Sequence, residues 1–344
     1  MNLAPQTILV LHPVGLAETV LAIPALRSLR AHFPGTKISV ATSPVAADIL
    51  RLGGGIDEIL PIGRLRRESI SPRTFYHSWS AIRALRERRD DIVLEFPNST
   101  ESRFLLQMVQ AATRLTAESS PKRGFPAALE RISRLFSPDR PTLTHTAHRY
   151  LQQLESLGVR PIEAEPYLRT EREADLRVDK ILAKKRWEYG ELLVGIHPGA
   201  GPRRPHWPID RFTSIARRFI HNFNARVIVF GGPSESRIAR RIVKQLPHDS
   251  AFAIQSPLAT DFASLLARMS LLVGNLSGPA HLATAVGTPV VAITGAPEPT
   301  PRDLLGRRNI HVRGQSVGLT REDEVYEAAC RLLKLNRAEA FSWR

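Results

Sequence analysis

The chain has a single cysteine, Cys330, among its 344 residues, which excludes an internal disulfide and a cysteine-ligated metal site. No apolar run approaches the roughly 20 residues that a membrane-spanning helix needs. A secretory signal peptide is not recognisable either, because the apolar run at 7–11 is short and leads into Pro13. These absences predict a cytoplasmic protein.

Aromatic residues are also sparse, at 6% of the chain, and only five are Tyr. Basic residues are not: 48 Lys and Arg against 33 Asp and Glu give a net charge of +15, which predicts an anionic partner. No basic motif is interleaved with aromatics, and no zinc-finger or RNA-recognition signature occurs, so we expect no nucleic acid. A phosphate-rich glycolipid at a membrane accounts for the charge equally well.

Short apolar runs alternate with helical patterns twice along the chain, which predicts two doubly wound parallel sheets, an α/β fold. We expect a helix over 98–115 and a last helix from Thr320 to about residue 335. The expected strands are 7–11, 37–41, 59–62 and 91–96 in the first series, and 192–197, 226–230, 252–254, 271–273 and 290–293 in the second.

A polar stretch with two prolines, residues 161–172, looks like a linker between two domains. The predicted organisation is therefore a first domain at 1–165, a linker and helix at 166–186, a second domain at 187–317, and a C-terminal helix within 318–344.

The most informative stretch is LLVGNLSGPAHLATAVGTPVVAITG, residues 271–295. It predicts a strand, a tight turn, a short helix and a second strand, because glycine and proline punctuate the apolar runs. Ser277 or Gly278 can cap the helix and Pro279 fits its first turn. A helix N-terminus directly after a strand favours a phosphate, although the same glycines also suit an ordinary strand–helix–strand turn.

This stretch resembles the D-[ST]-G-P-x-H-x-A-x-A-x-G-x-P segment of the ADP-heptose:lipopolysaccharide heptosyltransferases, glycosyltransferase family nine. Four segments resemble that family in order: 14–34, 145–158, 197–212 and 231–295. The resemblance implies the GT-B fold, with two Rossmann-like domains facing across a cleft. It also implies a nucleotide-sugar in the second domain, an acceptor in the first, and a last helix that packs back on the first domain.

The implied donor site spans three segments of the second domain. HPGAGPRRPHWPIDRF resembles the family's phosphate-binding loop, but Pro205 replaces its lysine, so Arg203 and Arg204 either supply the charge or are simply solvated. Glu235 corresponds to a glutamate that binds the ribose hydroxyls, and Leu258 lies near the adenine position. The implied donor-binding residues are Gly199, Ala200, Gly201, Arg203, Arg204, Glu235, Leu258, Ser277, Gly278, Pro279, Ala280 and His281.

Leu276 is a further departure, because the family has an aspartate there. Asn275 compensates little, since neighbouring side chains of a strand face opposite ways. His281 is either a donor contact or a packed core histidine, and we favour the second.

Glu18 aligns with the family's catalytic aspartate and is therefore the expected general base. A glutamate in a first helical turn can also merely complement the helix dipole. The run 64–89 is rich in arginine, either as a solvated face or as a patch for an anionic acceptor. The expected acceptor-binding residues are Gly15, Ala17, Arg64, Arg66 and Arg67.

The sequence therefore predicts a glycosyltransferase that moves a sugar, most simply heptose from ADP-heptose, to a lipopolysaccharide-type or other glycan acceptor. We expect no metal and no cofactor beyond the nucleotide-sugar substrate. A cytoplasmic location is compatible with peripheral contact at the inner membrane. The alternative is a non-catalytic glycan- or nucleotide-binding protein. A Glu18 carboxylate in the interdomain cleft would favour the enzyme, and one paired with surface arginines would favour the binding protein.

Overall fold

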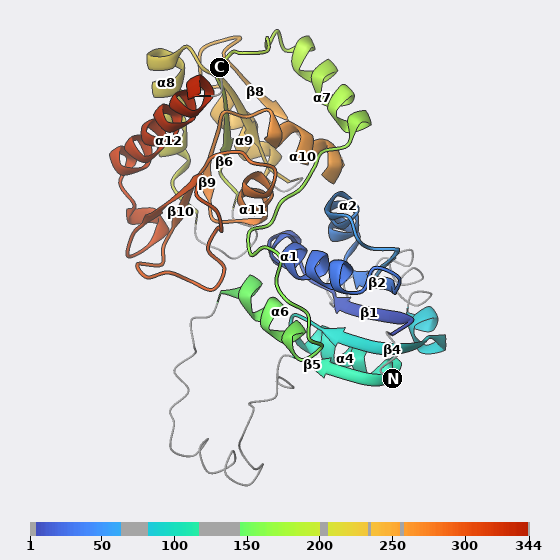
Figure 1. The fold of residues 1–344 in the computed structure, drawn as a ribbon. Coiled ribbons are helices and arrows are strands. Elements are labelled where there is room, and N and C mark those ends of the chain that lie inside the picture. The colour runs from blue at the N-terminus through green and yellow to red at the C-terminus, as the bar shows by residue number, and fades with distance from the viewer. Residues whose placement is uncertain are drawn as a thin grey trace. The chain divides into compact units, whose positions relative to one another are not determined.

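The computed structural model describes residues 5–62, 82–116, 145–199, 206–232, 235–254 and 258–342 (Figure 1). The chain divides into two compact units. The first comprises Met1–Ala47, Gly54–Ala164 and Thr300–Arg302, and the second comprises Asp48–Gly53, Glu165–Pro299 and Asp303–Arg344. We expected the first domain to end at residue 165.

The first unit is built on a five-stranded sheet in the order β3-β2-β1-β4-β5, with every neighbouring pair parallel. Its central strand β1 is apolar and buried, as expected for a parallel strand covered on both faces. The strands are β1 (Thr7–His12), β2 (Lys37–Thr42), β3 (Glu58–Pro61), β4 (Arg89–Glu95) and β5 (Gln110–Thr116).

The helices of the first unit are α1 (Leu16–His32), α4 (Thr100–Met108) and α6 (Thr146–Glu155). Helix α2 (Pro44–Gly53) begins in the first unit, and its residues from Asp48 onward are grouped with the second. The start of α2 shows why the sequence forms it there: Ser43 accepts a hydrogen bond from the backbone N–H of Ala46, and Pro44 occupies the first turn. Helices α1 and α6 contact each other, and α4 packs on β1 and β4.

The helix expected over 98–115 is wrong in its second half. Helix α4 ends at Met108, and Gln110–Thr116 forms strand β5, which pairs in parallel with β4 along its length. Gln, Ala, Arg and Leu favour helix in isolation, but pairing with a neighbouring strand overrides that local preference.

The second unit has a six-stranded parallel sheet in the order β11-β10-β9-β6-β7-β8. Counted from its own first strand, this is the Rossmann order 3-2-1-4-5-6. The strands are β6 (Leu193–His197), β7 (Arg226–Phe230), β8 (Ala251–Ile254), β9 (Leu271–Asn275), β10 (Val290–Thr294) and β11 (Asn309–Arg313). Strand β11 is missing from the sequence prediction.

The core of the second unit packs around large aromatic side chains. Trp207, Phe212 and Phe219 are fully buried among the apolar residues of β6, β7 and β9. The helices are α7 (Arg172–Lys184), α8 (Ile209–Phe223), α9 (Ser236–Val243), α10 (Ala259–Ala267), α11 (Gly278–Ala285) and α12 (Glu322–Ser342), with a short 3-10 turn at Val317–Leu319.

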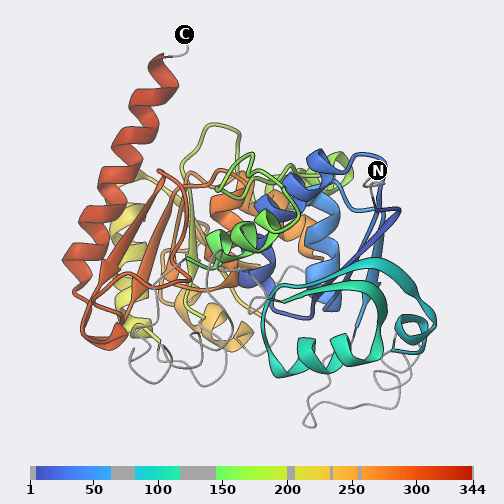
Figure 2. The same cartoon turned by 60° about the horizontal axis from the view of Figure 1, so that its bottom comes forward.

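The last helix packs on the sheet of the second unit. Helix α12 runs beside β9, β10, β11 and α8 of its own unit, and its C-terminal end extends beyond the sheet (Figure 2). Val325, Ala329 and Leu332 are buried in the core of the second unit. The described apolar face of this helix covers the second sheet, because burying that face there removes it from water. The expectation that the helix also packs back on the first domain stays a prediction.

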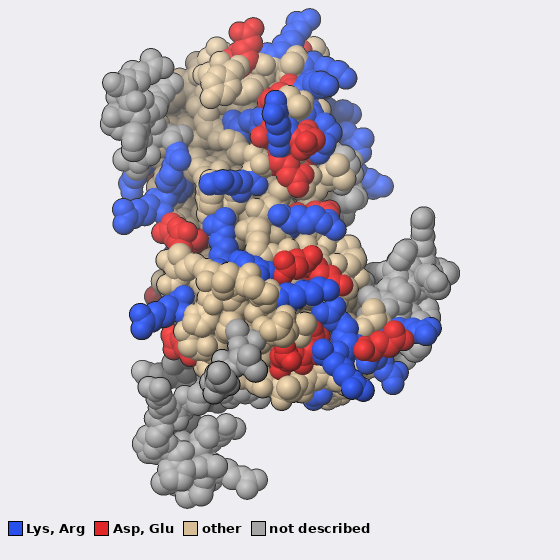
Figure 3. Space-filling view, turned by 45° about the vertical axis from the view of Figure 1, so that its right-hand side comes forward, with Lys and Arg blue, Asp and Glu red and all other residues tan. Residues whose placement is uncertain are grey.

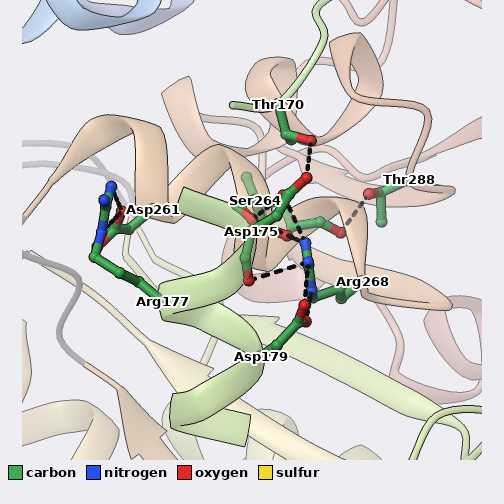
Figure 4. A network of polar contacts seen from close by, with 9 residues as sticks. Thr170, Asp175, Arg177, Asp179, Asp261, Ser264, Arg268 and Thr288 are labelled. Carbon is green, nitrogen blue, oxygen red and sulfur yellow. Dashed lines mark hydrogen bonds and ion pairs between the residues drawn. The ribbon is translucent and has the colours of Figure 1, made fainter. Parts of the chain in front are cut away.

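Helices α7 and α10 are joined by a network of ion pairs (Figure 4). The Arg268 guanidinium donates to Asp175 Oδ1 at 2.9 Å and to Asp179 Oδ2 at 3.0 Å, and Arg177 pairs with Asp261 at 2.6 Å. The hydroxyl of Ser264 also donates to Asp175. Arg268 is thus shared by two carboxylates of α7, and α7 is held against α10 by ion pairs as well as by packing.

Basic side chains lie among acidic ones on the face shown in Figure 3. Some of the positive charge is neutralised inside the units. Arg88, for example, pairs with Glu58 at 2.8 Å and with the buried Asp90 at 2.9 Å. The net charge of the chain therefore overstates the number of arginines that are available to a partner.

Candidate functional site

Open parallel sheets bind ligands at the carboxyl ends of the strands, where the strand order reverses. In the first unit this point lies between β1 and β4, and in the second between β6 and β9. His12 ends β1 and His197 ends β6, so each unit has a histidine at its reversal point.

Glu18 lies beside the reversal point of the first unit, in the first turn of α1. Gly15 is the N-cap of that helix, and its carbonyl accepts hydrogen bonds from the backbone and hydroxyl of Thr19. The Glu18 carboxylate pairs with Arg302 Nη1 at 3.2 Å, and the arginine side chain is 55% exposed. This pair is the arrangement that the sequence analysis associates with the binding protein.

His12 is fully buried under α6. Its ring meets those of Phe96 and Tyr150 edge-on, at 6.0 and 5.5 Å between centroids. Nε2 lies 3.3 Å from the Glu18 carbonyl, while Nδ1 has no hydrogen-bond partner within the described part of the chain. Burial lowers the pKa of His12 to about 4, so the ring is neutral at pH 7. Its surroundings are those of a packed side chain.

Glu235 lies at the end of β7 in the second unit, and glycines make room for it. It is the N-cap of α9, but its side chain makes no capping bond; Oε2 instead accepts from the Gly232 N–H at 2.9 Å. A Cβ atom at Gly199 would stand 2.1 Å from Oε1, and one at Gly231 would stand 2.6 Å from the Glu235 Cβ. Only glycine at 199 and 231 therefore admits this carboxylate.

Ser277 follows β9 and caps α11, again without a capping bond from its side chain. Its hydroxyl lies 3.2 Å from His197 Nδ1, and His197 Nε2 lies 3.8 Å from Glu235 Oε2. The His197 ring also stacks on Phe230. Burial lowers the pKa of His197 to about 4 despite the nearby Glu235 carboxylate, which acts in the opposite direction. A neutral imidazole thus lies between two polar side chains of the expected donor site.

The start of α11 offers fewer N–H groups to an anion than the sequence suggests. Pro279 has none, and the Ala280 N–H donates to the Ser277 carbonyl at 3.1 Å. Of the four residues from Ser277 to Ala280, only Ser277 and Gly278 are left to direct an N–H at a phosphate. His281 is buried, which agrees with the packed alternative.

The side chain of Asn275 is used in two hydrogen bonds to the backbone. Its Nδ2 donates to the Pro198 carbonyl at 2.8 Å, and its Oδ1 accepts from the Trp207 N–H at 3.2 Å. The buried amide therefore ties together the two ends of the segment 198–207. It leaves the missing aspartate at Leu276 uncompensated.

The remaining expected site residues divide into two groups. Leu258, at the start of α10, is 48% exposed and offers an apolar face, and Ala17 lies in the first turn of α1. The others lie outside the described residues: Ala200, Gly201, Arg203, Arg204, Arg64, Arg66 and Arg67.

The sequence analysis missed His197, Gly231 and Gly232 as site residues. His197 opens the HPGAG segment directly after a buried strand, and that position was the available signal. Gly231 and Gly232 precede Glu235 by a few residues, and the space around the Glu235 side chain requires Gly231.

Within the described part of the chain, no group of three or more His, Cys, Asp or Glu residues could hold a metal ion. None of the described helices is both long and apolar enough to cross a membrane.

Comparisons with known proteins give the family and the fold of the chain. The model of glycosyltransferase family 9 (heptosyltransferase) matches residues 78–326. The lipooligosaccharide heptosyltransferase 2 of Haemophilus influenzae is 23% identical over 321 residues, which is 86% of either chain.

Two solved structures share the fold. The family 9 glycosyl transferase of Veillonella parvula has a TM-score of 0.79 at 20% identity, covering 97% of this chain and 99% of its own. The ADP-heptose lps heptosyltransferase II of E. coli has a TM-score of 0.71 at 19% identity, covering 96% and 99%. The fold is thus GT-B, two parallel-sheet α/β units, and the chain belongs to glycosyltransferase family 9.

Proposed function

We propose that this glycosyltransferase moves heptose from ADP-heptose to an anionic glycan acceptor of the lipopolysaccharide type. One observation carries the donor half of the proposal. The Glu235 carboxylate and the Ser277 hydroxyl meet at His197, at the reversal point of the second sheet. Oε1 of Glu235 lies over Gly199, where it can accept from the hydroxyls of a ribose.

The neighbouring groups suit the rest of an ADP-sugar. The N–H of Gly278, at the N-terminus of α11, favours the diphosphate, with Arg203 or Arg204 as the expected cations. The half-exposed Leu258 supplies an apolar surface for the adenine. The H. influenzae and E. coli relatives are heptosyltransferases by name, which supports heptose as the sugar.

We assign the general base to Glu18. The acceptor hydroxyl would give its proton to this carboxylate while the hydroxyl oxygen attacks the anomeric carbon and the bond to the ADP phosphate breaks. The pair with Arg302 does not forbid this role, because exposed ion pairs contribute only about 0–1 kcal/mol and open easily. Phosphate groups on the acceptor would add attraction to the arginines of 64–89, and that attraction must weaken with salt.

The donor half is tested by ADP binding, measured by thermal shift and calorimetry. Gly278→Asp should abolish binding, because a carboxylate there repels and blocks the diphosphate. Gly35→Asp is the matched control, since Gly35 is exposed in the first unit with nothing within 4 Å of its Cβ position. Unchanged ADP affinity in a folded Gly278→Asp protein would refute the site.

The second candidate function is a binding protein that kept the fold. The pairing of Glu18 with a half-exposed arginine and the leucine at 276 favour it. The binding protein would hold a glycan or a nucleotide without turnover, and only the enzyme releases ADP from ADP-heptose in the presence of a lipopolysaccharide-type acceptor. ADP binding without any release under these conditions would favour the binding protein.

A further inference from the structure

Ser277 is placed to cap α11 and does not do so. A serine at an N-cap normally accepts a hydrogen bond from an N–H of the first turn, which contributes about 1 kcal/mol. Here the side chain makes no such bond, and its hydroxyl lies 3.2 Å from His197 Nδ1 instead. The loss of a local stabilising bond indicates that the His197 contact has another use.

The side chain of Glu235 likewise bonds elsewhere than to the helix that it caps. It too is an N-cap without a capping bond, and its carboxylate turns back over Gly199 toward His197. Oε2 accepts from Gly232 and lies 3.8 Å from His197 Nε2, a separation beyond hydrogen-bond range but close enough for electrostatic attraction. Two side chains from two different helix starts therefore converge on one imidazole.

The carboxylate decides where the single proton of the neutral ring resides. A proton on Nε2 is attracted to the Glu235 carboxylate 3.8 Å away, whereas a bare Nε2 would leave its lone pair near a negative charge. Nδ1 is then an acceptor, and the Ser277 O–H must donate to it. The order of donation runs from Ser277 to His197 and on toward Glu235.

We infer that His197 is a positioning residue that turns the Ser277 hydroxyl into a pure hydrogen-bond acceptor for a sugar hydroxyl of the nucleotide donor. With its proton committed to Nδ1, Ser277 presents only lone pairs to a ligand. A phosphate oxygen has no proton to offer and gains nothing there, whereas a sugar hydroxyl does. The inference rests on the proposed function, because it names which part of the nucleotide-sugar faces Ser277.

The ring proton can be located directly. Nitrogen-15 shifts of the His197 ring at pH 7.5 should show Nε2 protonated and Nδ1 bare, and Ser277→Ala should shift the Nδ1 resonance. A ring protonated at Nδ1 would overturn the inference, because Ser277 would then keep its proton for a ligand.

Binding distinguishes the part of the ligand that is recognised. The probes are inorganic pyrophosphate, ADP, 2′,3′-dideoxy-ADP and ADP-heptose. Ser277→Ala and His197→Phe, which keeps a ring to stack on Phe230, should each weaken a hydroxyl-bearing ligand about tenfold and leave pyrophosphate affinity unchanged. A loss seen with ADP but absent with dideoxy-ADP identifies the ribose, and a loss confined to ADP-heptose identifies the transferred sugar.

The double variant tests the connection itself. If His197 acts through Ser277, the two losses will not add, because either change breaks the same chain. Additive losses, or an equal loss of pyrophosphate affinity, would overturn the inference. If His197→Phe does not fold, Ser277→Ala with the four probes still decides between hydroxyl and phosphate.

His12→Phe is the matched control for the ring exchange, since His12 holds the same place in the first unit. It should leave all four affinities unchanged. Failure of the wild-type protein to bind ADP or ADP-heptose would refute the proposed function, whereas wild-type binding that is indifferent to His197→Phe and Ser277→Ala would refute only this inference.

Discussion

His12 and His197 occupy the same place in two different sheets and have different surroundings. Each is the last residue of the first strand of its sheet, beside the point where strand order reverses. Each is almost completely buried, and burial lowers the pKa of each to about 4.

The difference lies in what the two rings touch. His12 is surrounded by aromatic rings and meets one backbone carbonyl, with Nδ1 left unsatisfied in the described chain. His197 lies between a hydroxyl and a carboxylate from two other elements. A strongly lowered pKa therefore does not by itself mark a functional histidine. The side chains that converge on the ring are the better guide.

The largest effect should come from Glu18, the proposed general base, which lies beside the same reversal point as His12. Glu18→Gln should lower the rate of transfer about 10²–10⁴-fold, because the acceptor hydroxyl loses its base. Glu18→Asp should retain much of the rate, and both variants should bind ADP as the wild type does. Full activity in Glu18→Gln, measured as ADP release, would remove Glu18 from the mechanism.

Acid should destabilise the protein through both histidines. The unfolded chain takes up each proton near pH 6.5 and the folded chain only near pH 4, so between these values the unfolded state binds more protons. The free energy of unfolding should therefore fall as the pH is lowered, by about 2 kcal/mol per histidine at pH 5 relative to pH 8. Urea denaturation measures it.

His12→Phe and His197→Phe should each remove one share of this pH dependence. If the free energy of unfolding depends on pH in His12→Phe as it does in the wild type, the pKa of His12 is not lowered in the folded protein. The ring would then be protonated in the folded state or in contact with water. Such a result would break the parallel between the two units.

A variant at Arg268 tests whether the stability of the second unit can be changed without changing its ligand affinity. Arg268→Ala leaves Asp175 and Asp179 without their shared cation, and should lower the free energy of unfolding by about 1–3 kcal/mol. ADP affinity should not change. Lower affinity in the variant would mean that α7 and α10 also govern the donor site, which would weaken the assignment of that role to His197.

The smallest effect is expected from His12→Phe at pH 7.5. The substitution removes an unsatisfied nitrogen and keeps a ring against Phe96 and Tyr150, so stability should change by no more than about 1 kcal/mol. Transfer activity should remain at the wild-type level. A large loss of activity would give His12 a role in the reaction and erase the contrast with His197.

The sequence pattern predicted most of the parallel strands, because buried β-branched runs are a local signal. It failed where long-range contacts decide the structure. Strand β5 exists because β4 offers it hydrogen-bond partners, and strand β11 exists because β10 offers them. Neither partner can be read from the segment itself.

The candidate site was predicted in part for a related reason. Glu235 and Ser277 were identified because each of their segments resembles a motif of the family. His197 joins those two segments, and a connecting residue shows its role only when three distant strand ends come together. The need for glycine at 231 likewise becomes clear only from the side chain of Glu235, which lies against it in the folded chain.

The two hydrogen bonds of Asn275 have a consequence for how this protein can change. They fix Pro198 and Trp207 to the end of β9, so the stretch between them starts and finishes at anchored points whatever its composition. Replacement of the family lysine by proline at 205 falls inside that stretch, where it leaves both anchors intact. The loop between these two points can therefore be exchanged. Grafting the corresponding loop of a relative between 198 and 207 should alter ligand preference and leave the fold of the second sheet unchanged.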